Sequence, residues 1–261
     1  MPPPSLQSTD PRFPQPYPKG DGTINERNAS HLITQLLPAT LPPHSTYNLS
    51  ATHITLHNPT AASNAYVKTE YAYIRSYISA LHADHASDID LFVHLGMAPT
   101  EKVYVERRAY KQGMTSNWTW DGRRKPQPQE KPKPYYTRLD NAGQTVEAAG
   151  PCPWGEEVPV GLATGLDVDA VVEGAKAVLY KAEKEGVVRT PVGMEAHHEP
   201  GGYGCGFIYY ESLANKFVKG TRGEVLFVHV PSELDSESLE RGRDAVLAII
   251  AAAVKELEGA D

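Results

Sequence analysis

The chain has 261 residues, 40% of them hydrophobic, which supports one sizeable globular core. Its net charge of −7 at pH 7 excludes the overall basic field that nucleic-acid binding requires, so we expect no nucleic-acid partner.

Only two cysteines are present, Cys152 and Cys205. They are too few for a disulfide framework and fit a reducing compartment. No apolar run approaches membrane-spanning length, and the N-terminus lacks the basic and apolar regions of a signal peptide. We therefore expect a cytoplasmic protein with no membrane partner.

The predicted elements begin after a proline-rich segment at residues 1–23, which we expect to be a disordered arm. Asn28 or Ser30 is placed to cap a short helix that runs to Leu37 and ends at Pro38. Further predicted elements are a strand at 52–56, a helix with its apolar face between 66 and 81, and strands at 89–97 and 102–108.

Between about 113 and 156 the sequence lacks the hydrophobic periodicity of helices or strands, and a basic, proline-rich insertion is predicted there. Its densest runs lie at 123–128 and 131–134. A solvated surface loop is the favoured interpretation, because the runs are short and locally charged. A docking segment for an aromatic groove or an anionic partner is the alternative.

Regular structure is predicted again from Val168. The expected elements are a helix at 168–185, a strand beginning at Val187-Val188, a helix after Cys205, a strand at 225–230 and a last helix that starts at Asp235 or Ser236. Helices that alternate with apolar strands imply a three-layer α/β/α sandwich with a mixed central sheet. We expect residues 24–261 to form one domain of this α/β class.

The stretch from Gly201 to Pro231 carries the most specific chemistry. A glycine-dense turn places Cys205 at the start of a helix in which Phe207, Tyr210, Ala214 and Phe217 recur at helical spacing. A thiol at a helix N-terminus lies at the positive end of the peptide dipoles, which favours the thiolate. His229 lies near the C-terminal end of the next strand, where open α/β sheets hold functional groups.

Cys205 and His229 form a nucleophile–base pair if their two elements are neighbours. The alternative is structural, because free cysteines are often small buried hydrophobes and strand histidines often satisfy core hydrogen bonds.

The same stretch resembles the nucleophile region of the type I pyroglutamyl peptidases, also called pyrrolidone-carboxylate peptidases. That family carries Ser-Ala-Gly-x-Tyr-x-Cys-(Asn/Asp), an aromatic-rich helix and a strand that ends in His-Val-Pro. Gly201, Tyr203, Cys205 and the run 227–231 fit this pattern. Glu199-Pro200 stands where the family has Ser-Ala, and Gly206 where it has Asn or Asp.

The resemblance also implies a third catalytic residue. A carboxylate within a strand pattern usually faces solvent, and the pattern alone would place Glu106 there. However, the run 92–99 followed by Val105-Glu106-Arg107 resembles the family block whose glutamate completes the triad. The order Glu106, Cys205, His229 along the chain is the one that the family requires.

Further site residues are carried over from the family. Asn28-Ala29-Ser30 matches its Asn-(Pro/Ala)-Ser element, so Asn28 is expected to help shape the substrate pocket. Gly201, Gly202 and Tyr203 are expected beside the substrate. The family also has an Asp-Asn or Asp-Gly element after its catalytic glutamate, to which Asp140-Asn141 or Asp121-Gly122 corresponds. On this basis Arg138 is a candidate for the cationic side chain near the oxyanion.

The N-terminal part departs from the family, which opens with a strand and a Gly-Phe-x-Pro-Phe loop whose aromatic rings sandwich the pyroglutamyl ring. Nothing before Asn28 has this pattern, and Arg12-Phe13-Pro14 is at best a remnant that assigns Phe13 to substrate binding. Two explanations stay open. The N-terminal segment is missing or replaced in this sequence, or the protein has lost a central strand and half of its pocket.

The resemblance implies a cysteine peptidase that removes N-terminal pyroglutamate from short peptides with a blocked N-terminus, without a cofactor. A homo-oligomer is an open alternative for its assembly. A zinc site at His94 or His197-His198-Glu199 is disfavoured, because no two-plus-two ligand spacing exists; His94 is expected to satisfy backbone groups beneath the site. Two rival functions remain: a catalytically impaired relative that acts as a scaffold, and a related acyl hydrolase with a remodelled pocket.

Overall fold

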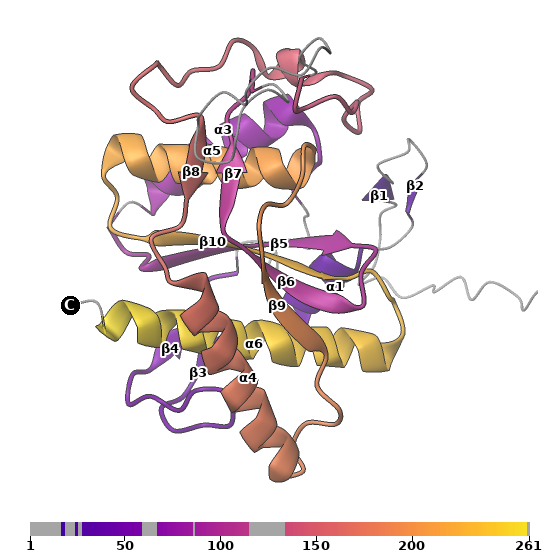
Figure 1. The fold of residues 1–261 in the computed structure, drawn as a ribbon, viewed down its shortest axis with the longest axis vertical. Coiled ribbons are helices and arrows are strands. Elements are labelled where there is room, and N and C mark those ends of the chain that lie inside the picture. The colour runs from indigo at the N-terminus through magenta and orange to yellow at the C-terminus, as the bar shows by residue number, and fades with distance from the viewer. Residues whose placement is uncertain are drawn as a thin grey trace, which may run out of the picture.

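A mixed four-stranded sheet between two layers of helices forms the centre of the computed structural model (Figure 1). The structure describes residues 28–58, 67–85, 87–114 and 134–259, together with the backbone of the short strands β1 (Tyr17–Pro18) and β2 (Ile24–Asn25).

The sheet has the strand order β5-β10-β6-β9. Its strands are β5 (Leu91–Ala98), β10 (Glu224–Pro231), β6 (Lys102–Glu106) and β9 (Gly193–His197). β5 runs parallel to β10, β6 runs antiparallel to β10, and β9 runs parallel to β6. The strands next to each other in space are therefore distant in the sequence.

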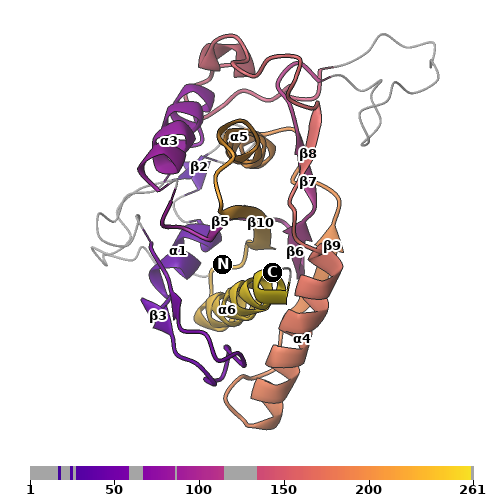
Figure 2. The same cartoon turned by 90° about the vertical axis from the view of Figure 1, so that its left-hand side faces the viewer.

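The two helical layers cover opposite faces of this sheet (Figures 1 and 2). One layer contains α3 (Tyr71–Asp84) and α5 (Gly204–Lys219). The other contains α1 (Ala29–Gln35), α4 (Val168–Lys184) and α6 (Ser236–Gly259). The predicted three-layer α/β/α fold with a mixed sheet is thus confirmed.

Short pairs of strands extend this framework. They are β3 (Thr40–Leu41) with β4 (Ile54–Thr55) and β7 (Arg108–Tyr110) with β8 (Gly161–Ala163), and a 3₁₀ turn lies at Val146–Ala149. β4 is the short core of the strand predicted at 52–56.

The register divides the sheet into an apolar face and a face that carries chemistry. Val103, Val105 and Val228 belong to the apolar core beneath α4 and α6. Residues directly opposite each other across β10 are His94 with Phe227, Gly96 with His229, and Glu106 with Phe227. Because side chains alternate between faces along a strand, these residues share the opposite face, which lies beneath α5.

Helix periodicity and capping predicted several elements well. The predicted inner face of α4 is buried at Val168, Val171, Ala175, Val178 and Ala182. Asn28 is the N-cap of α1, and its side chain accepts a hydrogen bond from the backbone N–H of His31. Of the two caps considered, Asn28 is therefore the one used.

Four details of the predicted elements are wrong. The helix whose apolar face was predicted from residue 66 begins only at Tyr71. Val187 and Val188 do not start a strand, because their backbone N–H groups bond to the carbonyl of Ala182 and close the end of α4. The strand at 102–108 is split after Glu106 into β6 and β7. Phe217 is 52% exposed, so the apolar spacing along α5 does not mark a buried position there.

The outer edge of β5 has no paired strand within the described ranges, where β5 pairs only with β10. No helix in the described part of the chain combines the length and apolar character needed to cross a membrane. Most of the N-terminal arm and residues 115–133 of the predicted insertion lie outside the described residues.

Candidate active site

Cys205 is the second residue of α5 and follows a tight glycine turn. Gly201 has φ +82°, a left-handed conformation that glycine adopts without strain. Tyr203 is the N-cap of α5, so the thiol lies in its first turn, where backbone N–H groups have no intrahelical acceptor. The predicted position of Cys205 at a helix N-terminus is confirmed.

His229 and Glu106 meet on neighbouring strands beneath this turn. Nδ1 of His229 lies 2.8 Å from Oε1 of Glu106. The Glu106 side chain is fully buried and that of His229 is 8% exposed. A carboxylate bonded to Nδ1 holds the imidazole in the orientation that leaves Nε2 for a second partner.

Cys205 is the candidate for that second partner, because its Sγ and Cδ2 of His229 would lie 3.0 Å and 3.1 Å from the same added Cβ at Gly96. Burial lowers the pKa of His229, but its interactions with Cys205 and with the Glu106 carboxylate outweigh burial and raise this pKa to about 10. The His229 ring therefore keeps its proton at pH 7. The thiol is only half-buried and lines a cavity, so a ligand can reach it.

Gly96 is a residue of this site that the sequence analysis did not select. A Cβ at position 96 would lie 2.8 Å from Cζ of Phe227, 3.0 Å from Sγ of Cys205 and 3.1 Å from Cδ2 of His229. The absence of a side chain thus lets the sulfur and the imidazole come together against β5. A glycine within a strand is a signal for such close approach.

We expect Gly96→Ala to lower turnover of a substrate about 100-fold, because a displacement of about 1 Å at reacting groups costs this much. The added methyl would push Cys205 away from His229. Gly193→Ala is the matched control, since a Cβ there would meet only the flexible side chain of Lys102, at 3.3 Å. Steady-state kinetics on both variants check this, and equal activity of the two would contradict the role given to Gly96.

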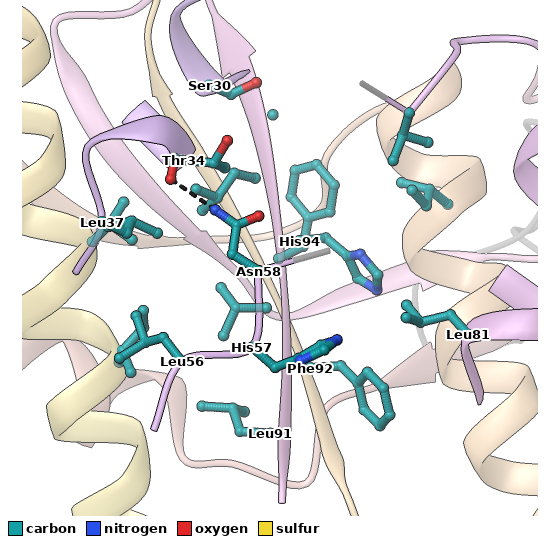
Figure 3. A pocket seen from close by; sticks show the side chains of 18 of the residues that line it. Ser30, Thr34, Leu37, Leu56, His57, Asn58, Leu81, Leu91, Phe92 and His94 are labelled. Carbon is teal, nitrogen blue, oxygen red and sulfur yellow. Dashed lines mark hydrogen bonds between the residues drawn. The ribbon is translucent and has the colours of Figure 1, made fainter. Parts of the chain in front are cut away.

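The cavity beside Cys205 has a volume of about 1710 Å³ and is lined along one side by β5. Figure 3 shows the wall where Nδ2 of Asn58 donates to the carbonyl oxygen of Thr34 at 2.8 Å, with His94 of β5 nearby. Both apolar and hydrogen-bonding groups line this space, so it can take a partly polar ligand of peptide size.

Several residues predicted to bind substrate line the same cavity, namely Asn28, Arg138 and Tyr203. The guanidinium of Arg138 lies 5.9 Å from the centre of the Tyr203 ring. The Tyr203 hydroxyl donates to Oδ1 of Asn141 at 3.1 Å, which ties the turn before Cys205 to the Asp140-Asn141 segment.

The remaining predicted substrate residues have other positions. Gly201 and Gly202 shape the turn before α5, and neither belongs to the cavity wall. A Cβ at Gly202 would lie 2.2 Å from the backbone oxygen of Tyr135, so this turn packs tightly on a neighbouring segment. Phe13 lies outside the described residues. The binding roles of all these residues stay predictions.

His94 differs from its predicted role, because its Nε2 lies 2.9 Å from the hydroxyl of Ser212 rather than against backbone groups. Nε2 of His82 lies 2.7 Å from the same hydroxyl. Burial lowers the pKa of His82 to about 4 and that of His94 to about 3, so both rings are neutral at pH 7. This series of hydrogen bonds, from His94 through Ser212 to His82, joins β5 to α5 and α3. Its role is structural.

His197 is a further neighbour of the site that the sequence analysis weighed only as a metal ligand. Its Nδ1 lies 2.8 Å from Oε2 of Glu106, the oxygen that His229 does not use. In the described part of the chain, no three His, Cys, Asp or Glu side chains are grouped so that they could hold a metal ion.

Comparisons with known proteins identify the fold. No protein-family model and no curated protein matches the sequence. The structure of pyrrolidone carboxyl peptidase from Thermococcus litoralis is similar, with a TM-score of 0.58 and 15% identity over 90% of this chain and 90% of that chain. A mutant pyrrolidone carboxyl peptidase from Pyrococcus furiosus has a TM-score of 0.53 and 17% identity over 88% of this chain and 92% of that chain. This chain therefore has the fold of the pyrrolidone carboxyl peptidases.

Proposed function

We propose that the chain is a cysteine peptidase that removes an N-terminal pyroglutamyl residue from short peptides. The observation that carries this proposal is the convergence of Cys205, His229 and Glu106, with Cys205 in the wall of a cavity. A nucleophile, a base and a group that orients the base are the parts required for covalent acyl transfer. The fold shared with pyrrolidone carboxyl peptidases supports pyroglutamate as the acyl group.

The reaction begins with the thiolate of Cys205 and the imidazolium of His229. The sulfur attacks the carbonyl carbon of the peptide bond after the pyroglutamyl residue, and the carbonyl oxygen takes the negative charge. Backbone N–H groups at the start of α5 stabilise this oxyanion, because they are free of intrahelical bonds and lie at the positive end of the helix.

The tetrahedral intermediate collapses when Nε2 of His229 gives its proton to the leaving amine and the C–N bond breaks. This leaves a pyroglutamyl thioester on Cys205. A water molecule then loses a proton to His229 and attacks the thioester. Free 5-oxoproline is released, and the thiolate–imidazolium pair is restored. Glu106 keeps the imidazole oriented throughout.

A pair of fluorogenic amides tests the substrate class. We expect turnover of the pyroglutamyl amide to exceed that of the prolyl amide by at least about 100-fold, because a site built to bond the lactam oxygen loses this partner in proline. The two substrates share ring size and leaving group. Equal rates, or cleavage of neither, would contradict a pyroglutamyl peptidase.

The catalytically impaired scaffold makes a different prediction, motivated by the outer edge of β5, which pairs with no strand among the described residues. An exposed strand edge is a template for an added strand from a partner. In a scaffold, Cys205 would react with iodoacetamide at neutral pH no faster than an ordinary thiol. A related acyl hydrolase would instead have a reactive thiol and cleave other N-terminally blocked peptides.

A further inference from the structure

The carboxylate of Glu106 is held by two imidazoles. Oε1 lies 2.8 Å from Nδ1 of His229, and Oε2 lies 2.8 Å from Nδ1 of His197. The Glu106 side chain is fully buried, whereas that of His197 is 43% exposed. His197 therefore connects the surface of the molecule to the buried group that orients His229.

The sheet fixes His197 in this place. In the parallel pair of β6 and β9, His197 lies directly opposite Glu106. The backbone N–H of Arg107 donates to the carbonyl oxygen of His197 at 3.0 Å. The imidazole stacks on the ring of Tyr104, with centroids 4.6 Å apart and planes inclined by 21°. Backbone and ring are thus both restrained.

A second donor matters because a carboxylate held at one oxygen can turn about its terminal torsion, which is broad for glutamate. A bond at each oxygen restricts this rotation and keeps Oε1 facing Nδ1 of His229. It also satisfies an oxygen that would otherwise be buried without a partner, which is unfavourable above all for a charged group.

We propose that His197 is a positioning residue of the active site, which acts on His229 through Glu106. The inference rests on the proposed function for its role in turnover. It predicts that the orientation of the imidazole, and with it the reactivity of the Cys205 sulfur, depends on a hydrogen-bond donor at position 197. The second ring nitrogen of His197 is not required.

Three variants separate this role from a merely structural one. His197→Ala removes the donor. His197→Asn keeps an N–H group on the same side-chain branch as Nδ1 and is the conservative rescue. Glu195→Gln is the control on β9, since Glu195 forms only a half-exposed pair with Lys102 at 2.7 Å.

The first readout is the rate of Cys205 alkylation by iodoacetamide at neutral pH, which needs no peptide substrate. We expect His197→Ala to slow alkylation about tenfold, the smaller of the effects typical when an outer hydrogen-bond partner of a metal-binding histidine is removed. His197→Asn restores most of the rate, and Glu195→Gln leaves it unchanged. In turnover, the same loss falls on kcat and leaves KM unaltered.

A double-mutant cycle, measured by the alkylation rate, tests whether His197 acts on Cys205 through Glu106. If His197 acts through Glu106, then His197→Ala has little further effect once Glu106→Gln is present. Equal losses in both backgrounds, or no rescue by His197→Asn, would overturn the inference. If the wild-type chain alkylates rapidly and fails to cleave a pyroglutamyl amide, the peptidase proposal fails while the role of His197 is still decided by the cycle.

Discussion

Replacing Cys205 by serine is expected to lower turnover of a pyroglutamyl amide by at least about 10⁴-fold, because the loss of a nucleophile removes the covalent route. The substitution exchanges one atom, and Cys205 is half-buried at the start of α5, so the fold should persist. Circular dichroism and thermal unfolding of Cys205→Ser check this, alongside the kinetics.

Cys152→Ser is the matched control, because it is the other free cysteine and it lies in the 150–158 loop. Its sulfur is bonded only weakly, 3.9 Å from the carbonyl oxygen of Trp154. We expect Cys152→Ser to retain full activity and rapid alkylation at Cys205. If Cys205→Ser retains wild-type turnover, the acyl-enzyme mechanism is wrong.

The second large effect is expected from Glu106→Gln, which should lower kcat about 10²- to 10⁴-fold, as loss of the orienting carboxylate does in a serine protease triad. The amide is nearly isosteric with the carboxylate but carries no charge. It can no longer stabilise the His229 imidazolium or accept a bond at both of its former oxygens.

The pH dependence of Glu106→Gln follows from the raised pKa of His229. In the wild type the ring keeps its proton up to a pKa of about 10, above its ordinary value of 6.5. Activity that needs the imidazolium therefore falls only as pH rises through about 10. Without the charge of Glu106 this pKa drops, and the alkaline limb of the kcat/KM profile should move to lower pH.

The same shift has a consequence for stability. The folded chain binds the proton of His229 more tightly than the unfolded chain, so this stabilisation is complete below pH 6.5 and is lost between pH 6.5 and about 10. Denaturant unfolding across this window should show a decline in the wild type that is smaller in Glu106→Gln. An alkaline limb unchanged by the substitution would contradict the role of Glu106.

The helices were largely predictable because their signals are local. Every third or fourth residue of α4 is apolar, and the run selected from this period is buried. The Asn28 cap also acts within one turn. The strand predicted at Val187 and Val188 was wrong, because two apolar residues fit the end of a helix as well as the start of a strand. Only their backbone bonds to the Ala182 carbonyl show that they end a helix.

The nucleophile and the base could be selected from motifs and helix chemistry, whereas the strand pattern alone would have left Glu106 facing solvent. Gly96 and His197 were not selected as site residues because their roles depend on pairing between distant segments. Gly96 is important because β5 pairs with β10, which places it opposite His229. His197 is important because β9 pairs with β6, which places it opposite Glu106, some 90 residues earlier in the chain.

The sequence by itself determined which residues bear the chemistry, where the helices run and which strands are apolar, since propensity and periodicity act over a few residues. Only the tertiary structure decided that Glu106 is buried between two histidines. It also decided that Cys205 and His229 meet beside Gly96, where β5 has no side chain. The physical reason is that strand order and register are set by the burial of both sheet faces at once, and no local pattern of residues specifies that outcome.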